Sequence, residues 1–376
     1  MNATRTYLDW NATAPLRREA RAAMVAALDI VGNPSSPHAE GRRARAIVED
    51  AREQVAALVG AKPAEVVFTS GGTEGNNAVL AAGWSVILVA GVEHDSVLAP
   101  ARNSRARLID LPVGSDGVVR RDGLFATVPQ PSGGRALLTL QLANNETGVL
   151  QPVADIARDA KDHGLAIHTD AVQAAGRVAL DVAALGVDYL TLSAHKLGGP
   201  KGVGALVIRE GASLQPLVAG GGQERRRRAG TENVAAIAGF GAAAHAARRD
   251  LTRTQHVQAL RTRLEDEVRA ITPEAIVIAE HAARLPNTTN LALPGASAET
   301  LVIALDLAGI AVSAGAACSS GKVGTSHVLA AMGVAPHLAR AAIRVSLGYG
   351  STERDVASFL AAWSHIAEGR RQRAVA

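Results

Sequence analysis

A glycine-rich turn, a carboxylate and a lysine each follow a short apolar run in this sequence. Gly71-Gly72-Thr73 comes after "EVVFTS" (residues 65–70), and small residues with free backbone N–H groups at a helix start suit a phosphate. Asp170 ends the run "LAIHTD", where a carboxylate can pair with a protonated ring nitrogen. Lys196 follows "DYLTLS", and burial at such a position can convert a lysine into a nucleophilic amine. Taken singly, these features are also typical of a plain turn, a helix cap and an exposed loop lysine.

The only cysteine of the chain lies in the segment "SAGAACSSGK" (residues 313–322). Isolated cysteines are usually inert core residues. Ala, Gly and Ser surround Cys318, however, and residues this small and polar do not pack a core. The segment therefore predicts a loop that can carry a thiol between positions, and the nearby Lys322 favours the thiolate.

The composition limits the class of protein. The chain has 376 residues, 48% of them hydrophobic and 20% charged, which are globular values that allow two domains. One cysteine forms no intrachain disulfide, and neither a signal peptide nor a membrane span is evident, so we expect a cytoplasmic protein without a membrane partner. The densest basic run, Arg225–Arg228, is expected to be a solvated loop or a subunit contact, because only 3% of the residues are aromatic and nucleic-acid patches usually include aromatic side chains.

Strand-length apolar runs alternate with helical patterns from about residue 60. Further strands are expected in "SVILVAG", "RALLTLQL" and "GALVIR", which predicts an α/β fold with a mostly parallel sheet covered by helices. Residues 231–270 read as almost wholly helical. The strands "AIVIA", "TTNLAL" and "AIRVSL", a helix from about Ala298 and a final helix then predict a smaller α+β domain. We expect a large domain over residues 15–255 and a small domain formed by residues 1–14 and 256–376, with the cysteine loop at about 313–327.

In combination, the phosphate turn, Asp170 and Lys196 resemble the pyridoxal-phosphate enzymes of fold type I, and specifically the cysteine desulfurases of the nitrogen-fixation and housekeeping iron–sulfur type. The resemblance runs nearly end to end, through "YLDWNATAP", "GNPSSPH", "TSGGTEGNN", "VEHDSVL", "NNETGVLQP", "HTDAVQAAG", "SAHKLGGPKGVGAL", "GGGQERRRRAGTEN" and "IRVSLG". "SAGAACSSGK" falls where the family has its catalytic cysteine loop. The sequence departs from the family at Val323-Gly324-Thr325, where members with this loop length often carry Leu-Glu-Pro. The family's large domain has a seven-stranded sheet, which we therefore expect here.

The resemblance implies pyridoxal 5'-phosphate as cofactor and assigns residues to it. Lys196 would attach it covalently, Asp170 would pair with its ring nitrogen, His94 would stack on its ring and transfer protons, and Gln173 would bond its phenolic oxygen. The implied phosphate ligands are Gly72, Thr73, Ser193 and His195, with Thr231 from the neighbouring subunit of a homodimer.

For the substrate, the resemblance implies L-cysteine, with its carboxylate bound by Arg344 and by Asn145, which would also contact the cofactor. Cys318 would attack the sulfur of L-cysteine, release L-alanine and keep a persulfide. An iron–sulfur scaffold or another acceptor protein would then receive the sulfur. No intrinsic metal site is implied, although Cys318 can serve as a transient shared iron–sulfur ligand.

Two kinds of alternative remain open on the sequence. An aminotransferase or a selenocysteine lyase would keep the fold, and a plain aminotransferase would not require Cys318. A non-catalytic nucleic-acid-binding protein would use Arg225–Arg228 and would bind DNA or RNA in a salt-dependent way.

Overall fold

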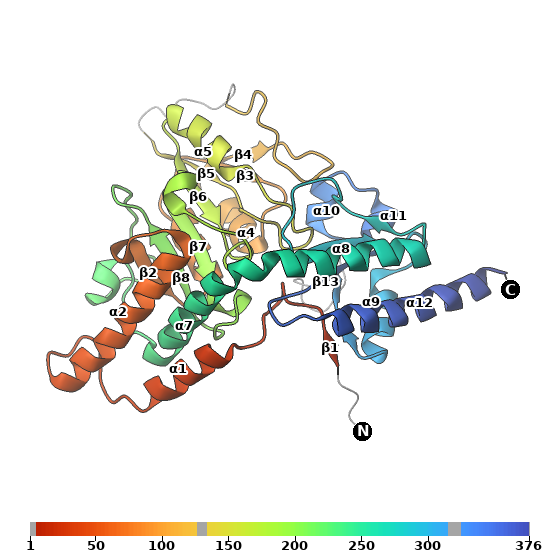
Figure 1. The fold of residues 1–376 in the computed structure, drawn as a ribbon. Helices are drawn as coiled ribbons and strands as arrows, with labels where there is room; N and C mark the ends of the chain where they lie inside the picture. The colour runs from red at the N-terminus through yellow and green to blue at the C-terminus, as the bar shows by residue number, and fades with distance from the viewer. Residues whose placement is uncertain (1–4, 126–133, 315–324, 376) are drawn as a thin grey trace.

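The central feature of the fold is a large sheet with helices packed around it (Figure 1). The computed structural model describes residues 5–125, 134–314 and 325–375. In that part of the chain, seven strands pair in the order β2-β8-β7-β6-β5-β3-β4. Only the pairings of β8 with β2 and with β7 are antiparallel, so the expected mostly parallel sheet is confirmed. The strands are β2 (Val66–Thr69), β3 (Val86–Ala90), β4 (Arg107–Leu111), β5 (Ala136–Thr139), β6 (Ala166–Asp170), β7 (Tyr189–Ser193) and β8 (Gly204–Ile208).

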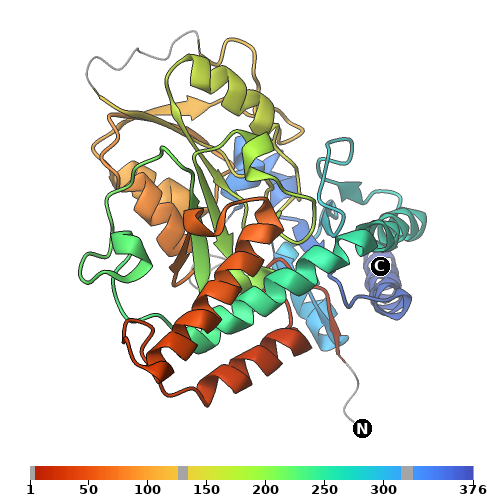
Figure 2. The ribbon, with the colours of Figure 1, turned by 60° about the vertical axis from the view of Figure 1, so that its left-hand side comes forward.

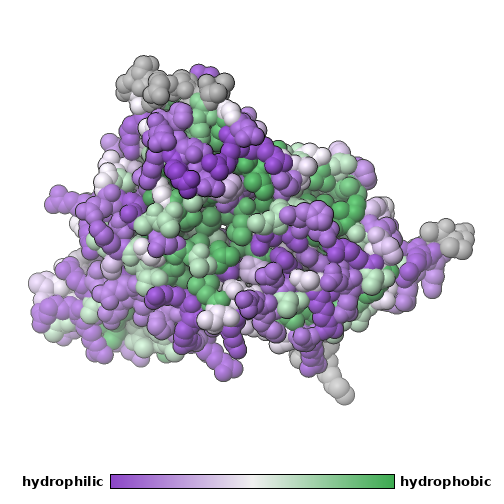
Figure 3. All heavy atoms as spheres, turned by 45° about the horizontal axis from the view of Figure 1, so that its top comes forward, coloured by the Kyte–Doolittle hydropathy of each residue, from purple (hydrophilic) through white to green (hydrophobic). Residues whose placement is uncertain are grey.

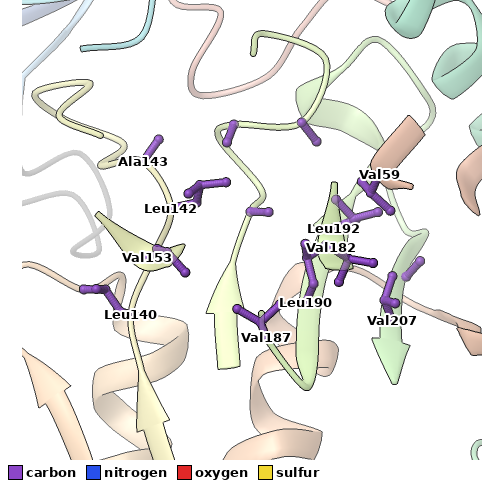
Figure 4. Close-up of a cluster of buried hydrophobic side chains, with 14 of the residues drawn as sticks. Val59, Leu140, Leu142, Ala143, Val153, Val182, Val187, Leu190, Leu192 and Val207 are labelled. Carbon is purple, nitrogen blue, oxygen red and sulfur yellow. The ribbon is translucent and has the colours of Figure 1, made fainter. Parts of the chain in front are cut away.

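Both faces of this sheet are apolar. Every residue of β2, β3, β5, β7 and β8 is buried, and successive residues of a strand point to opposite sides. Phe68, Leu88 and Leu190 pack on the face covered by α2, α5, α6 and α7. Figure 4 shows part of that core, in which Leu190 of β7 lies opposite Val207 of β8. The alternate strand residues, such as Ile87, pack against α3 and α4 on the other face. The helices of this layer are α2 (Ala39–Val59), α3 (Gly72–Leu80), α4 (Asp95–Asn103), α5 (Val153–Asp162), α6 (Val182–Leu185) and α7 (Val234–Asp250).

A second sheet has its own apolar core. In the described chain, β12, β13, β10 and β9 form an antiparallel sheet in that order, and β1 pairs separately with β11. Its core includes Leu264, Phe359 and Trp363, and Leu8 from the N-terminal segment joins it. The strands are β1 (Thr6–Tyr7), β9 (Ile276–Val277), β10 (Thr288–Ala292), β11 (Ile310–Ala311), β12 (Ser313–Ala314) and β13 (Ala342–Ser346).

Two long helices connect the sheets in space. α7 packs along α1 (Arg18–Leu28) and α2, and after a single turn the chain continues as α8 (Thr254–Ile271), which lies beside α12 (Glu353–Val375) (Figures 1 and 2). The expectation of an almost wholly helical stretch at 231–270 is therefore confirmed. The remaining helices are α9 (Ala298–Leu307), α10 (His327–Ala331) and α11 (Pro336–Ala339).

The sequence reading named no strand at β4. Only Leu111 of its five residues is buried, and Arg107 and Asp110 are exposed. β4 is an edge strand, so it lacks the continuous apolar run by which the central strands were found.

The segment that precedes Thr231 contains an unusual turn. Glu224, Arg225 and Arg226 have φ values of 44°, 58° and 66°, a left-handed conformation that disfavours residues with a Cβ atom. The buried side chain of Glu224 anchors the turn to the rest of the fold. Its carboxylate accepts two hydrogen bonds from Arg52 of α2, at 2.7 and 2.8 Å, and one from the backbone N–H of Phe68 at 2.9 Å. Arg225 is exposed, whereas Arg228 pairs with Glu74 at 2.9 Å.

Candidate active site

A cavity of about 340 Å³ lies at the carboxyl ends of the central strands. This is the edge where ligands bind in open α/β sheets. Its lining brings together ten of the residues that the sequence singled out, which are Gly72, Thr73, His94, Asn145, Asp170, Gln173, Ser193, His195, Lys196 and Arg344. The face seen in Figure 3 is largely hydrophilic, with a central band of hydrophobic side chains.

The first turn of α3 forms one wall of the cavity. Gly71 is the N-cap residue and makes no side-chain capping bond, so the N–H groups of the first turn have no intrahelical acceptor. A Cβ atom on Gly72 would lie 2.8 Å from Cγ2 of Val172, so only glycine lets the helix approach the end of β6 this closely. The free N–H groups and the positive end of the helix dipole make this wall suitable for an anion.

Lys196 reaches the cavity from the short 3₁₀ turn after β7. Its Nζ donates to the backbone oxygen of Asn11 at 2.6 Å and to that of Ala12 at 3.0 Å. Gln173 Nε2 donates to the same oxygen of Asn11 at 3.0 Å. The N-terminal segment therefore orients two cavity side chains that are far away in the sequence.

Asp170, at the end of β6, is held by two donors. Its Oδ1 accepts from the backbone N–H of Val172 at 2.9 Å, and its Oδ2 accepts from Asn76 Nδ2 at 2.7 Å. Asn76 is fully buried and Asp170 is 8% exposed. These contacts fix a carboxylate at the wall of the cavity, where it can face a cationic group.

Both cavity histidines favour the neutral state. Burial is the largest cause that lowers the pKa of His195, to about 4, and the charges of Lys196, Lys201 and Arg177 lower it further. Burial also lowers the pKa of His94, and the positive charge of Lys196 adds to this effect although Asp170 opposes it. At neutral pH, neither histidine adds a positive charge to the cavity.

Arg344 projects from β13, so the second sheet also contributes to the cavity. Its Nη2 donates to Asp9 Oδ1 at 2.7 Å and its Nη1 to the backbone oxygen of Asn145 at 3.0 Å. Its buried Nε has no hydrogen-bond partner among the described residues. A buried donor without an acceptor is unfavourable, which makes Arg344 a candidate for binding a carboxylate that enters the cavity.

The described lining of the cavity does not include two of the predicted residues. Thr231 is exposed just before α7 and does not line the cavity of its own chain. Cys318 lies outside the described residues, as does most of the predicted cysteine loop.

The sequence reading missed several residues of the site. Asn11, Ala12, Asn76, Ser96, Gln141, Ala143 and Val172 also line the cavity. Asn76 could have been identified from the sequence, because it follows Gly72 by about one helical turn and so lies on the same helix face. The position of Asn11 depends instead on contacts with residues more than a hundred positions away.

Two buried glutamates lie close to this region. Glu146 accepts from Ser326, the N-cap residue of α10, at 2.6 Å, and burial raises its pKa to about 6. Glu93 is fully buried, and burial raises its pKa well above the ordinary value, with the charge of Asp170 adding to the shift. Its Oε1 accepts from the backbone N–H of Gln141 at 2.7 Å.

Comparisons with known proteins identify the family of this chain. Residues 6–359 match the family model described as aminotransferase class-V. The chain is a member of this class-V aminotransferase family. It is 40% identical over 362 residues to the cysteine desulfurase IscS of Dictyoglomus turgidum, which covers 93% of this chain and 91% of the relative.

Solved structures that resemble this chain include a NifS-like protein and SspA. A NifS-like protein from Rickettsia africae has a TM-score of 0.89 and 34% identity, with 97% of this chain and 99% of that protein covered. SspA, solved in complex with cysteine, has a TM-score of 0.78 and 29% identity over 91% of this chain and 98% of that protein. The expected fold class, an α/β enzyme of fold type I, is confirmed, as is the resemblance to the cysteine desulfurases.

The donor set of this class-V enzyme fits pyridoxal phosphate. The uncapped first turn of α3 suits its phosphate, Asp170 suits a protonated ring nitrogen, and Lys196 supplies a primary amine at the same cavity. The described residues contain no group of three or more His, Cys, Asp or Glu side chains arranged to hold a metal ion. Within those same ranges, no helix is long and apolar enough to cross a membrane.

Proposed function

We propose that the protein is a pyridoxal-phosphate-dependent cysteine desulfurase that provides sulfur for iron–sulfur cluster assembly. The observation that carries the proposal is the meeting of Lys196, Asp170 and the first turn of α3 at one cavity that Arg344 enters from the second sheet. The 40% identity to a cysteine desulfurase over 93% of the chain supports it.

Lys196 would attach the cofactor, while Asp170 keeps a proton on its ring nitrogen. When bound, pyridoxal phosphate supplies an electron sink for carbanion chemistry on an amino acid. The N–H groups at Gly72 and Thr73 would bind its phosphate together with Ser193 and His195. His94 and Gln173 would then contact its ring and its phenolic oxygen.

Arg344 and Asn145 would bind the carboxylate of L-cysteine. The thiolate of Cys318 would form a bond to the sulfur of the substrate, and the carbon–sulfur bond would break. The electron pair of that bond stays on carbon, which takes up a proton to give L-alanine. L-cysteine and the thiol of Cys318 thus become L-alanine and a persulfide, with no external oxidant.

The substitution Cys318→Ser tests the reaction. We expect cofactor content and melting temperature close to those of the parent, because serine has nearly the same size as cysteine. Sulfide and alanine release from L-cysteine should stop, because a hydroxyl is a poor nucleophile beside a thiolate. In the parent under turnover without reductant, mass spectrometry should find one added sulfur atom on the peptide containing Cys318.

Sustained sulfide release by Cys318→Ser would exclude the desulfurase mechanism. Amino-group transfer to a keto acid by that variant would favour an aminotransferase instead. A second variant, Lys196→Ala, tests the cofactor site, because it should lose covalent attachment of the cofactor after borohydride reduction. Attachment at Lys62, Lys161, Lys201 or Lys322 would show that the cofactor site lies elsewhere.

We further propose that the enzyme acts as a homodimer in which Thr231 contacts the cofactor phosphate of the other subunit. Its exposed position, following the turn held by Glu224, supports this. Mixing inactive Lys196→Ala chains with inactive Thr231→Arg chains should rebuild one intact site per heterodimer. Failure to regain activity after verified subunit exchange would place the role of Thr231 within its own subunit.

The remaining assignments belong to the same proposal. The large domain would cover residues 15–255, and the small domain would combine residues 1–14 with 256–376; the pairing of β1 with β11 and the packing of Leu8 support this division. We place the enzyme in the cytoplasm, as its single cysteine suggests, with a scaffold or other acceptor protein as partner. Sulfide and alanine assays with candidate scaffolds added would identify the acceptor.

A further inference from the structure

His94 is held by the start of the helix that follows it. It is the N-cap residue of α4, and its Nδ1 lies 3.1 Å from the backbone nitrogen of Ser96 and 2.8 Å from Ser96 Oγ. A backbone N–H only donates, so Nδ1 must be the acceptor and carries no proton. The neutral ring therefore has its proton on Nε2.

The hydroxyl group of Ser96 is itself oriented by Asn76. Asn76 Nδ2 donates to Ser96 Oγ at 2.9 Å and to Asp170 Oδ2 at 2.7 Å. Because Ser96 Oγ accepts one hydrogen bond there, its own hydrogen is available to His94 Nδ1. Hydrogen bonds thus run from Asn76 through Ser96 to His94, and a second branch from Asn76 ends at Asp170.

The orientation of the Asn76 amide is also determined. Turning it over would place Oδ1 against the carboxylate of Asp170, and two acceptors would face each other without a proton. In the present orientation, Oδ1 is buried and has no partner in the described part of the chain. The two hydrogen bonds that Nδ2 donates, to Asp170 and to Ser96, therefore determine the orientation of the amide.

The surroundings of His94 oppose a second proton on the ring. A proton on Nδ1 would point at the N–H of Ser96, and the positive end of the α4 dipole disfavours a cation at this position. Burial lowers the pKa of His94, and Lys196 and His327 also lower it. Asp170 and Asp95 favour protonation but do not reverse the shift.

We infer that Ser96 and Asn76 are positioning residues that hold His94 neutral, with its only ring proton on Nε2. His94 then offers an N–H donor rather than an imidazolium to a group bound in the cavity. It accepts no proton at Nε2 unless the ring changes tautomer, which the contact with Ser96 opposes. The amide of Asn76 donates both to Ser96 and to Asp170, so a single side chain positions His94, through Ser96, and the carboxylate of Asp170. Only the nature of the bound group rests on the proposed function.

Ring ¹⁵N chemical shifts of histidine-labelled full-length protein test the inference, with and without added pyridoxal phosphate. A His94→Gln sample identifies the resonances of His94. We expect an unprotonated Nδ1 and a protonated Nε2 at neutral pH, and a ring that remains neutral below the ordinary pKa of histidine. A protonated Nδ1 in the parent, as the other tautomer or as an imidazolium, would overturn the inference.

Ser96→Ala removes one of the two donors to Nδ1 and leaves a residue that favours helices. We expect the ratio of the Nδ1–H to the Nε2–H tautomer to rise by about two- to tenfold, the worth of one hydrogen bond. Ser96→Thr keeps the hydroxyl and should restore the parental ratio. Asn76→Ala should shift the ratio in the same direction as Ser96→Ala, but less.

Ser104→Ala is the matched control. Ser104 is the C-cap residue of the same helix and donates to Ala101 O at 2.7 Å, so its loss should leave His94 unchanged. A folded Ser96→Ala protein with the parental tautomer ratio would refute the role of Ser96. These signals do not depend on sulfide release. A protein with another activity could therefore still show the expected tautomer, and a true desulfurase could fail to show it.

Discussion

Two buried arginines of this protein each pair with a carboxylate, one behind the large sheet and one beside the cavity. Behind the large sheet, Arg52 forms a two-pronged pair with Glu224, and the side chains are 6% and 2% exposed. Beside the cavity, Arg344 makes a single hydrogen bond to Asp9, and the side chains are 6% and 20% exposed. The two arginine side chains are thus equally buried, and the comparison concerns their partners.

The difference separates a structural arginine from one that can bind a ligand. Burial alone would lower the pKa of Arg52, but the hydrogen bonds and charge of Glu224 raise it overall. Arg52 also donates to the backbone oxygen of Val66 at 2.8 Å, so its donors are used inside the fold. Arg344 keeps a buried Nε without a partner in the described chain, and its carboxylate partner is partly open to solvent.

The largest effect is expected from Arg52→Met, which leaves Glu224 buried without its cation. We expect a loss of about 3–5 kcal/mol in the free energy of unfolding, measured by urea titration. The control Arg43→Met, at an exposed position of the same helix, should stay within about 0.5 kcal/mol of the parent. A loss below about 1 kcal/mol in Arg52→Met would remove the structural role of the pair.

Arg344→Lys should separate binding from stability. Lysine keeps the charge opposite Asp9 but lacks the planar fork of arginine. We expect KM for L-cysteine to rise about ten- to a hundredfold, with the free energy of unfolding within about 1 kcal/mol of the parent. Arg340→Lys, an exposed position of the same region, is the control and should change neither quantity. An unchanged KM in Arg344→Lys would contradict a role in carboxylate binding.

Glu146 is a buried carboxylate whose charge interacts with Arg344, so its titration tests the cavity side of the comparison. Burial raises its pKa to about 6, against 4.5 for an ordinary glutamate. Ser326, His327 and Arg344 lower the pKa and only partly oppose this shift. Between these two values, the folded state binds more protons than the unfolded state, so this group makes stability fall as pH rises. Glu146→Gln keeps an acceptor for Ser326 and removes the titration.

Urea titrations across pH 4–8 measure the effect. Relative to Glu146→Gln, the parent should lose about 2 kcal/mol as the pH rises from 4 to 7, with about two thirds of the loss between pH 4.5 and 6. Glu53→Gln, at an exposed position of α2, is the control and should leave the pH profile unchanged. Parallel pH profiles of the parent and Glu146→Gln would show that Glu146 titrates normally.

The smallest effect concerns the turn that Arg52 and Glu224 hold. Arg226 has a φ of 66°, which glycine adopts without strain, so Arg226→Gly should stabilise the protein by about 0.5–1 kcal/mol. Arg227 has a φ of −90°, and Arg227→Gly should instead destabilise it slightly. Urea titration of both variants measures the contrast. Equal effects would mean that the left-handed conformation of Arg226 stores no strain.

The sequence by itself determined the α/β architecture and several positions of the candidate site. Apolar runs with polar ends identified the central strands, and each strand end then placed its own polar residues, as with Asp170 after β6 and Lys196 after β7. These features depend on neighbours along the chain, and the parallel pairing of β6 and β7 brings their carboxyl ends to one edge. The family resemblance added the residues that strand ends alone do not mark, such as His94 and Arg344.

Only the tertiary structure decided how those residues are held. Asn11 orients Lys196 across 185 positions, Arg52 supports Glu224 across 172, and Asn76 holds Asp170 across 94. Each contact depends on the packing of whole elements, which no local pattern records. The same applies to the proton of His94: its sequence neighbour Ser96 was visible, but the geometry that fixes Nδ1 as an acceptor exists only once α4 and Asn76 are in place.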